Sequence, residues 1–289
     1  MAGGDGHGEP FGRGGEAEAL RLADAFTRYL KSCRDERVSL STLPPGRFLL
    51  PGEMEGSPAL TFAPLDLSGR VPPADSLAAL MERRFESYKR LVVMPFYTRH
   101  FATLDRQIVL VDALAALNAG PAALADLEVA LADVLTAFRP GANSILSSML
   151  GRRIDRILFA ATKADHLHQT SHDRLEALLK RLTDRAIRRA SFAGAGVDAV
   201  ALAALRATRE TTVPGERAGA ETFTGTEEVA VFPGALPADP AALFDGPDAF
   251  RGEDYRFVRF LPPKADPTQA LPHIRLDRAV EFLIGDRLA

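Results

Sequence analysis

The sequence predicts an α/β fold whose parallel sheet is extended by helical segments and a small antiparallel β segment. Three short apolar runs, at 106–112, 156–161 and 198–205, have the length and composition of buried strands. Two segments with helical spacing separate them, one opening at 118–121 and ending before Pro140, the other over 171–189. Strands that alternate with helices form parallel βαβ units with right-handed crossovers.

Composition places the chain among globular proteins. Its 289 residues are 46% hydrophobic and 25% charged, enough for a full core in one large domain or two small ones. The net charge of −3 supplies no basic field that would attract nucleic acid or anionic lipid. Cys33 is the single cysteine, which excludes an internal disulfide and suits a reducing compartment.

The sequence predicts neither a membrane span nor an export signal. No apolar run approaches the roughly 18 to 20 residues that a transmembrane helix needs. Residues 1–15 have neither a basic n-region nor an apolar h-region. We therefore expect a cytoplasmic protein.

The part of the chain before the first strand is predicted to be mainly helical. Residues 1–15 have too few apolar side chains to offset the entropy of ordering, so we expect a flexible lead-in. Amphipathic helices are predicted over 16–37 and 76–92. The Pro- and Gly-rich stretch between them predicts short extended pieces at 47–50 and 60–62.

The part after the third strand changes character. Segments 228–232 and 255–261 alternate apolar and polar residues between Gly and Pro breaks, which is typical of antiparallel strands. Apolar residues at helical spacing predict a closing helix over 276–288 that docks on the domain. The predicted organisation therefore has four parts: a lead-in, a mainly helical segment, an α/β domain, and a β excursion with its closing helix, at 1–15, 16–104, 105–211 and 212–289.

The second strand ends at Thr-Lys-Ala-Asp, residues 162–165, which has the form of a guanine-recognition tetrapeptide. The Asp165 carboxylate could accept two hydrogen bonds from N1–H and N2–H₂ of guanine, whereas adenine offers an acceptor at N1 and no N2 amine. The Lys163 stem would lie along the base, and Thr162 would tie the loop to neighbouring backbone. The alternative is an ordinary loop with a solvated Lys and Asp.

A metal site is a rival interpretation of the same region. His166, His168 and His172 lie close to Asp165 in sequence, and imidazole and carboxylate groups are suitable ligands for zinc or nickel. The competing explanation is a polar loop and helix start with solvated histidines. We expect no metal site.

A phosphate-binding loop is absent from these 289 residues. Gly-x-x-x-x-Gly-Lys-Ser/Thr is needed so that backbone amides and a lysine can surround phosphates, but no lysine in the chain follows a glycine. Residues 66–69, Asp-Leu-Ser-Gly, match the Asp-x-x-Gly switch pattern but lie in the Pro-rich stretch. Hydrolysis has no evident machinery, and we assign no catalytic residue.

Several long motifs resemble the YcjX-like family of bacterial P-loop NTPases. The most extensive runs from Phe101 to Leu117 and is followed by Asn118-x-Gly120; further matches are residues 45–52, 157–166, 271–277 and 281–286. The resemblance implies part of a Ras-like GTPase fold with added helical and β segments. It also implies GTP or GDP as ligand, Mg²⁺, slow hydrolysis and a link to stress responses.

The resemblance also implies roles for individual residues. Base recognition is transferred to Thr162, Lys163 and Asp165, and the backbone N–H groups of Ala204 and Leu205 are expected near guanine O6. Family members have their phosphate loop and switch motif in an earlier stretch. We therefore expect an N-terminally truncated, C-terminal part of such a GTPase, with little NTPase activity alone. The alternative is a non-catalytic scaffold or interaction module that keeps the fold.

The first strand should have an unusual environment. In this fold the strand that bears the phosphate loop lies beside the strand ending at Asp112. Without it, an apolar central strand becomes an edge that can pair with another chain. We expect aggregation, dimerisation or dependence on a missing N-terminal segment or a protein partner.

Overall fold

The computed structural model describes residues 15–33, 50–134, 153–211, 219–222, 231–232, 236–245, 257, 260 and 270–288. The chain divides into two compact units, Met1–Ala102 and Thr103–Ala289. The predicted lead-in and most of the pieces predicted at 47–50 and 255–261 lie outside the described residues. Within the described ranges, no helix combines the length and apolar character needed to cross a bilayer.

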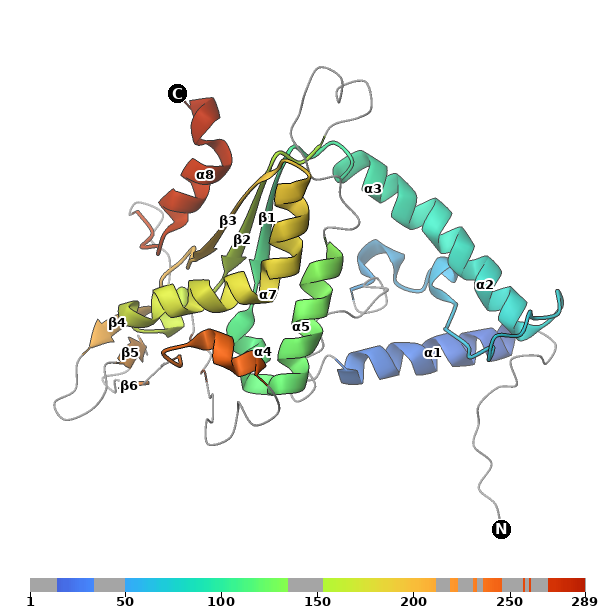
Figure 1. The fold of residues 1–289 in the computed structure, drawn as a ribbon. Helices are drawn as coiled ribbons and strands as arrows, with labels where there is room; N and C mark the ends of the chain where they lie inside the picture. The colour runs from blue at the N-terminus through green and yellow to red at the C-terminus, as the bar shows by residue number, and fades with distance from the viewer. Residues whose placement is uncertain are drawn as a thin grey trace, which may run out of the picture. The chain divides into compact units, whose positions relative to one another are not determined.

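The first unit is built on helices (Figure 1). Helix α1 covers Glu16–Cys33, and α2 covers Leu77–Tyr88, beginning where the Ser76 hydroxyl accepts a hydrogen bond from the Ala79 amide at 3.2 Å. The predicted end at residue 92 is wrong, because one π turn, Lys89–Val93, leads directly into α3, Met94–His100. Pro95 lies in the first turn of α3, and a wider turn before it accommodates the missing proline N–H.

The core of this unit gathers apolar side chains from α1, α2 and the segment between them, namely Ala19, Ala23, Leu30, Phe62, Leu77, Met81 and Tyr88. The extended piece predicted at 60–62 is wrong. Pro58–Leu60 forms a 3₁₀ turn, because the Ser57 hydroxyl caps it and Pro58 suits its first position. The Phe62 ring then lies 5.3 Å from the Tyr88 ring.

The second unit contains a parallel three-stranded sheet, which confirms the predicted fold class. Its strands are β1 (Arg106–Val111), β2 (Arg156–Ala161) and β3 (Gly196–Ala201), in the order β1-β2-β3. Arg106 pairs with Arg156, which pairs with Gly196, so the three strands begin and end level with one another.

Helices cover both faces of this sheet (Figure 1). Helices α4 (Ala113–Ala119), α5 (Pro121–Val134) and α7 (His172–Phe192) pack on the face that contains Ile157 and Phe159. They share a face because successive right-handed crossovers progress in one direction across the sheet. Helix α8 (Leu276–Leu288) packs on the opposite face through Ala279, Phe282 and Leu283, so the closing helix is confirmed.

Strand β1 is an edge strand among the described residues, as expected: it pairs only with β2 there, and Ile108 is 40% and Leu110 62% exposed. Two other details of the predicted α/β unit are wrong. Strand β3 ends at Ala201, because the next carbonyl turns to accept the Ala164 amide. Helix α4 follows β1 at once, because the Asp112 carboxylate accepts a hydrogen bond from the Ala115 amide at 3.1 Å.

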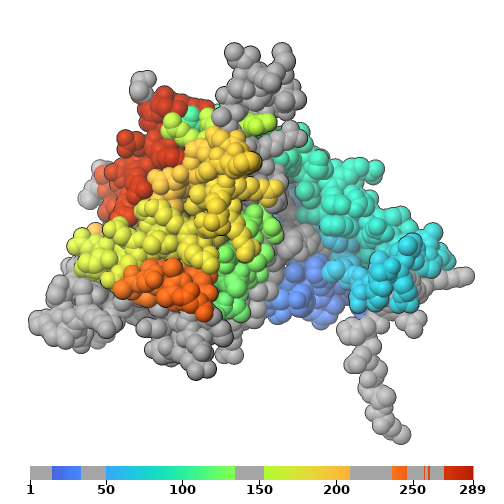
Figure 2. Space-filling view, viewed as in Figure 1, coloured from blue at the N-terminus to red at the C-terminus, as the bar shows by residue number. Residues whose placement is uncertain are grey.

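Smaller elements complete the second unit. An antiparallel sheet joins β4 (Thr208–Thr211), β5 (Gly219–Thr222) and β6 (Val231–Phe232) in that order. It confirms an antiparallel addition, although β4 begins before the predicted boundary. The 3₁₀ turn Pro240–Phe244 lies against α7, visible as orange atoms beside yellow ones in Figure 2. The Arg181 guanidinium stacks 4.3 Å from the centre of the Phe244 ring.

Candidate functional site

The predicted site residues lie at one edge of the parallel sheet. Asp112 follows β1, residues 162–165 follow β2, and the bend at 203–206 follows β3. The three strands end level with one another, so these segments meet at the carboxyl ends of the strands. This is the edge at which open α/β sheets bind ligands.

Thr162 and Lys163 connect the end of β2 to the end of β1. The Thr162 amide donates to the Val111 carbonyl at 2.9 Å, and its hydroxyl donates to the same oxygen at 3.3 Å. Lys163 has the left-handed backbone angle φ 63°, which is uncommon for a residue other than glycine. Its ammonium forms an ion pair with Asp112, while its side chain stays 39% exposed. The Lys163 side chain is thus held at the edge of the sheet.

Asp165 is buried, with 5% of its surface exposed, and two hydrogen bonds hold it to the chain after β3. Carboxylate atom Oδ2 accepts a hydrogen bond from the Ala207 amide at 2.8 Å. The Asp165 carbonyl accepts a hydrogen bond from the Thr208 hydroxyl. Carboxylate atom Oδ1 accepts no hydrogen bond from any other residue that the structure describes. The buried carboxylate therefore has its orientation fixed through one oxygen and retains acceptor capacity at the other.

Ala204 and Leu205 lie in the bend between two anchored residues. The Ala203 amide donates to the Ile274 carbonyl at 3.1 Å, and the Ile274 amide donates to the Ala203 carbonyl at 2.8 Å. The Arg206 amide donates to the Pro272 carbonyl at 2.8 Å. By contrast, the amides of Ala204 and Leu205 donate to no carbonyl or side chain in the described ranges.

The three histidines of the metal hypothesis take separate partners. The His166 ring meets Phe260 edge-on at 4.8 Å, and burial lowers the pKa of His166. The His168 ring accepts the Thr170 amide at 3.4 Å, and a His172 ring nitrogen lies 3.3 Å from the Leu167 carbonyl. Over the described ranges, no group of three His, Cys, Asp or Glu side chains is placed to hold a metal ion.

The Asp-x-x-Gly match has a local structural use. Asp66 accepts a hydrogen bond from the Ser68 amide at 2.8 Å, and Ser68 and Gly69 both have positive φ angles, 48° and 73°. Asp66 thus stabilises a tight turn of the type that Asp favours. The turn lies in the first compact unit, whereas the other predicted residues lie in the second.

Sequence reasoning missed the residues that hold the site together. Ala207 and Thr208 fix Asp165, while Pro272 and Ile274 hold the bend from outside. They act mainly through backbone groups or one hydroxyl, so their side-chain types contain little signal. The run 271–277 stood out only in the family resemblance.

Comparison with known proteins identifies the family and the relatives of this chain. The model of the YcjX-like family, DUF463, matches residues 9–288. The "Ras-like GTPase YcjX" of Escherichia coli K12 is 39% identical over 287 residues, covering 94% of this chain and 60% of that protein. The "Ras-like GTPase YcjX" of Shewanella oneidensis MR-1 is 35% identical, covering 94% of this chain and 58% of that protein. The chain thus spans about three fifths of these relatives' length, and it belongs to the YcjX-like family.

Proposed function

We propose that this chain binds guanine nucleotide, GTP or GDP, through the loops that follow β2 and β3. Asp165 accepts the guanine N1–H and N2–H₂ groups, the Lys163 stem lies along the base, and Thr162 holds the loop to β1. The amides of Ala204 and Leu205 donate to O6. The relatives named Ras-like GTPases support this assignment.

One observation supports the proposal most strongly. The 2.8 Å hydrogen bond from the Ala207 amide joins the Asp165 carboxylate to the bend that contains Ala204 and Leu205. The groups for guanine O6 and for its N1–H and N2–H₂ donors therefore belong to one hydrogen-bonded unit. Two amides without partners among the described residues and a buried carboxylate with spare acceptor capacity match the acceptor and donors of guanine.

The phosphates and Mg²⁺ lack the binding motif that the base does not need. In P-loop NTPases, backbone amides and a lysine of the phosphate loop surround the β- and γ-phosphates, and its Ser or Thr holds Mg²⁺. These 289 residues contain no such motif. We propose that this chain alone binds nucleotide weakly and hydrolyses little, and we derive no catalytic step.

Nucleotide titration tests the proposal. The purified chain, with Mg²⁺ present, should bind fluorescent GDP more tightly than fluorescent ADP. Asp165→Asn should lose GDP and gain xanthosine diphosphate, because xanthine presents an oxygen where guanine has its N2 amine. Asp24→Asn makes the same chemical change on the exposed face of α1 and should change neither affinity. A folded chain that binds neither GDP nor ADP would refute the proposal.

A second candidate function is an interaction module that docks through β1. Ile108 and Leu110 are exposed apolar residues on a strand that pairs on one side among the described residues. Such edges pair with further strands. Sedimentation should show association of the chain, and Leu110→Lys should reduce it. A monodisperse, cooperatively melting monomer would contradict this candidate.

A further inference from the structure

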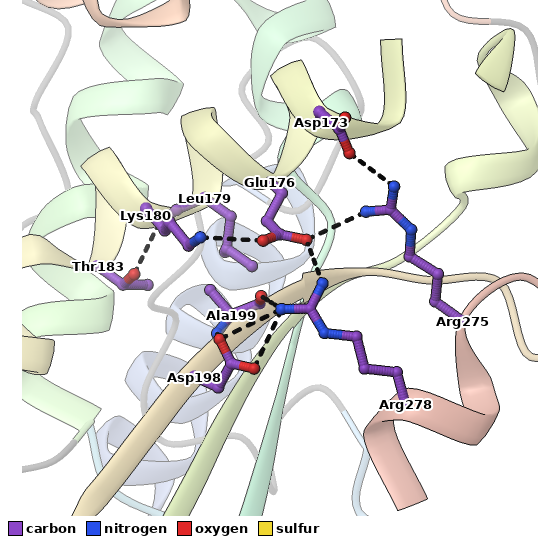
Figure 3. Close-up of polar contacts among 9 residues, drawn as sticks. All are labelled: Asp173, Glu176, Leu179, Lys180, Thr183, Asp198, Ala199, Arg275 and Arg278. Atoms are coloured by element: carbon purple, nitrogen blue, oxygen red, sulfur yellow. Dashed lines mark hydrogen bonds and ion pairs between the residues drawn. The ribbon is translucent and has the colours of Figure 1, made fainter. Parts of the chain in front are cut away.

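A cluster of six charged side chains joins the start of α8 to α7 and β3 (Figure 3). At its centre the Glu176 carboxylate, on a residue only 8% exposed, accepts hydrogen bonds from three cations. Two further carboxylates flank it. The contacts are Lys180–Glu176 at 2.9 Å, Arg275–Glu176 and Arg278–Glu176 at 3.1 Å, Arg275–Asp173 at 2.6 Å and Arg278–Asp198 at 3.1 Å.

The cluster fixes Arg275, the residue that follows Ile274. Ile274 in turn pairs with Ala203 at the start of the bend. Arg275 has a left-handed backbone angle, φ 53°, which is unfavourable for a residue with a side chain. Its guanidinium contacts Glu176 and Asp173 with different nitrogen atoms. This two-point contact holds Arg275 in an uncommon conformation, and Ile274, the residue before it, pairs with Ala203 through both backbone groups.

A continuous series of contacts therefore leads from Glu176 to the proposed base site. Arg275 sets the direction of the segment 272–275. That segment pairs with Ala203 on one side of the bend and accepts the Arg206 amide on the other. The next amide, that of Ala207, holds the Asp165 carboxylate.

The energetics of these ion pairs favour a positioning role for the cluster. Only the Glu176 carboxylate is buried, whereas the side chains of its partners Lys180, Arg275 and Arg278 are 52%, 29% and 43% exposed. Taking charges out of water costs about as much as the pairing returns, so apolar residues of similar size would often stabilise a fold equally well. Ion pairs with several defined contacts instead fix the relative positions of the segments that they join. Arg278 also reaches the Ala199 carbonyl of β3 at 3.5 Å, so the start of α8 is placed relative to both α7 and the sheet.

We propose that Glu176 is a positioning residue for guanine recognition: through Arg275 and Arg278 it holds segment 272–275 against the bend and so aims the Ala204 and Leu205 amides at O6. The inference rests on the proposed guanine binding. It assigns base specificity to an ion-pair cluster that does not touch the nucleotide.

Two readouts on the full chain test this inference. The first is amide hydrogen exchange at Ala203, Ile274 and Arg206 without nucleotide. The second is the affinity for GDP compared with 6-thio-GDP, which replaces O6 by a weaker acceptor, and with inosine diphosphate, which lacks the N2 amine. The first comparison reports on the bend and the second on Asp165.

Glu176→Gln should accelerate exchange at these amides and weaken GDP binding about threefold to tenfold, the value of one hydrogen bond. The preference for GDP over 6-thio-GDP should fall by a similar factor, while the preference over inosine diphosphate changes less. Arg275→Ala breaks the same contact from the other side, and should act alike if Glu176→Gln fails to fold. Arg275→Lys keeps the charge without the two-point contact and should be intermediate.

Two control variants separate positioning from general stability. Lys180→Gln removes a cation that contacts Glu176 from the same helix, and Asp286→Asn loosens the other end of α8. Both should keep wild-type exchange at the bend and the wild-type preference over 6-thio-GDP.

Unchanged exchange in both Glu176→Gln and Arg275→Ala would overturn the inference. Faster exchange with an unchanged preference over 6-thio-GDP would overturn it as well. If the wild-type chain binds no GDP, the proposed function fails and the role in base recognition fails with it. The exchange data still decide separately whether Glu176 holds the bend.

Discussion

The two ends of α8 are both attached by arginine–carboxylate contacts, but the contacts differ in which partner is buried and in what they hold. At the N-terminal end, Arg275 and Arg278 meet Glu176, whose side chain is 11% exposed. At the C-terminal end, Arg106 and Arg156 meet Asp286. There the carboxylate is the exposed partner, with its side chain 42% exposed, whereas the Arg106 side chain is 10% exposed.

The difference follows from the direction of the helix. Its N-terminal end lies at the carboxyl ends of the strands, beside the bend at 203–206, whereas its C-terminal end reaches Arg106 and Arg156, where β1 and β2 begin. One end is therefore connected to the candidate site and the other to the opposite edge of the sheet. Similar chemistry at the two ends should have different consequences.

Removing the buried acceptor should have the largest effect on stability. We expect Glu176→Ala to lower the free energy of unfolding by about 2–3 kcal/mol, below the value for a fully buried pair because the arginine partners reach water. Urea denaturation at pH 7 measures this. Asp286→Ala is the matched change at the other end, and an equal or larger loss there would contradict the comparison.

Changing the apolar middle of α8 should affect both ends together. Ala279 is 2% exposed and packs on the sheet, so Ala279→Leu should cost about 1–2 kcal/mol by overpacking. Hydrogen exchange should rise at both ends of the helix. Val280→Leu is the control, because Val280 is 41% exposed and the change should stay within about 0.5 kcal/mol. Protection retained at either end of Ala279→Leu would show that the ion pairs hold α8 without its packing.

Acid should break the contact between Arg106 and Asp286 at the C-terminal end of α8 in a defined pH range. The hydrogen bond from Arg106 lowers the pKa of Asp286 from its ordinary value of 3.8 to about 2. A lowered carboxyl pKa means that the stabilisation is present above pH 3.8 and is lost as the pH falls to 2. Asp286→Asn should therefore be slightly less stable than wild type at pH 7, by urea midpoint, and the difference should vanish between pH 4 and 2. A constant difference would show that Asp286 does not act through its charge.

The stability of the chain should also depend on the protonation of His166, in a milder pH range. This is the smallest of the expected effects. Burial lowers the pKa of His166, so the folded chain favours the neutral ring. The stabilisation is complete above the ordinary pKa of about 6.5 and declines as the pH falls through the lowered value. Titration of His166 by NMR should give a pKa below 6.5, and His166→Gln should flatten the stability profile in that range. A pKa at or above 6.5 would contradict the burial.

Much of the fold could be predicted because its signals are local. The apolar runs of β1 and β2 and the stripe of α7 appear in the sequence at strand and helical spacing. The end of β3 could not be predicted, because Leu202 and Ala203 continue its apolar pattern. They leave the strand where the Leu202 carbonyl accepts the Ala164 amide and Ala203 pairs with Ile274.

Some residues of the candidate site could likewise be predicted from the sequence, and others could not. Asp165 and Lys163 have side chains whose chemistry indicates a base, so their types and spacing were informative. Ala204 and Leu205 matter through backbone amides, which every non-proline residue has, and only their place in the family resemblance indicated them.

The sequence by itself determined the alternation of strands and helices, the family, and the residue types at the ends of the strands, since each depends on neighbours a few positions apart. Only the tertiary structure decided that Asp165 is fixed by Ala207 and that Glu176 meets Arg275 across 99 positions. Contacts across such separations depend on how the layers pack, and side-chain periodicity does not encode them.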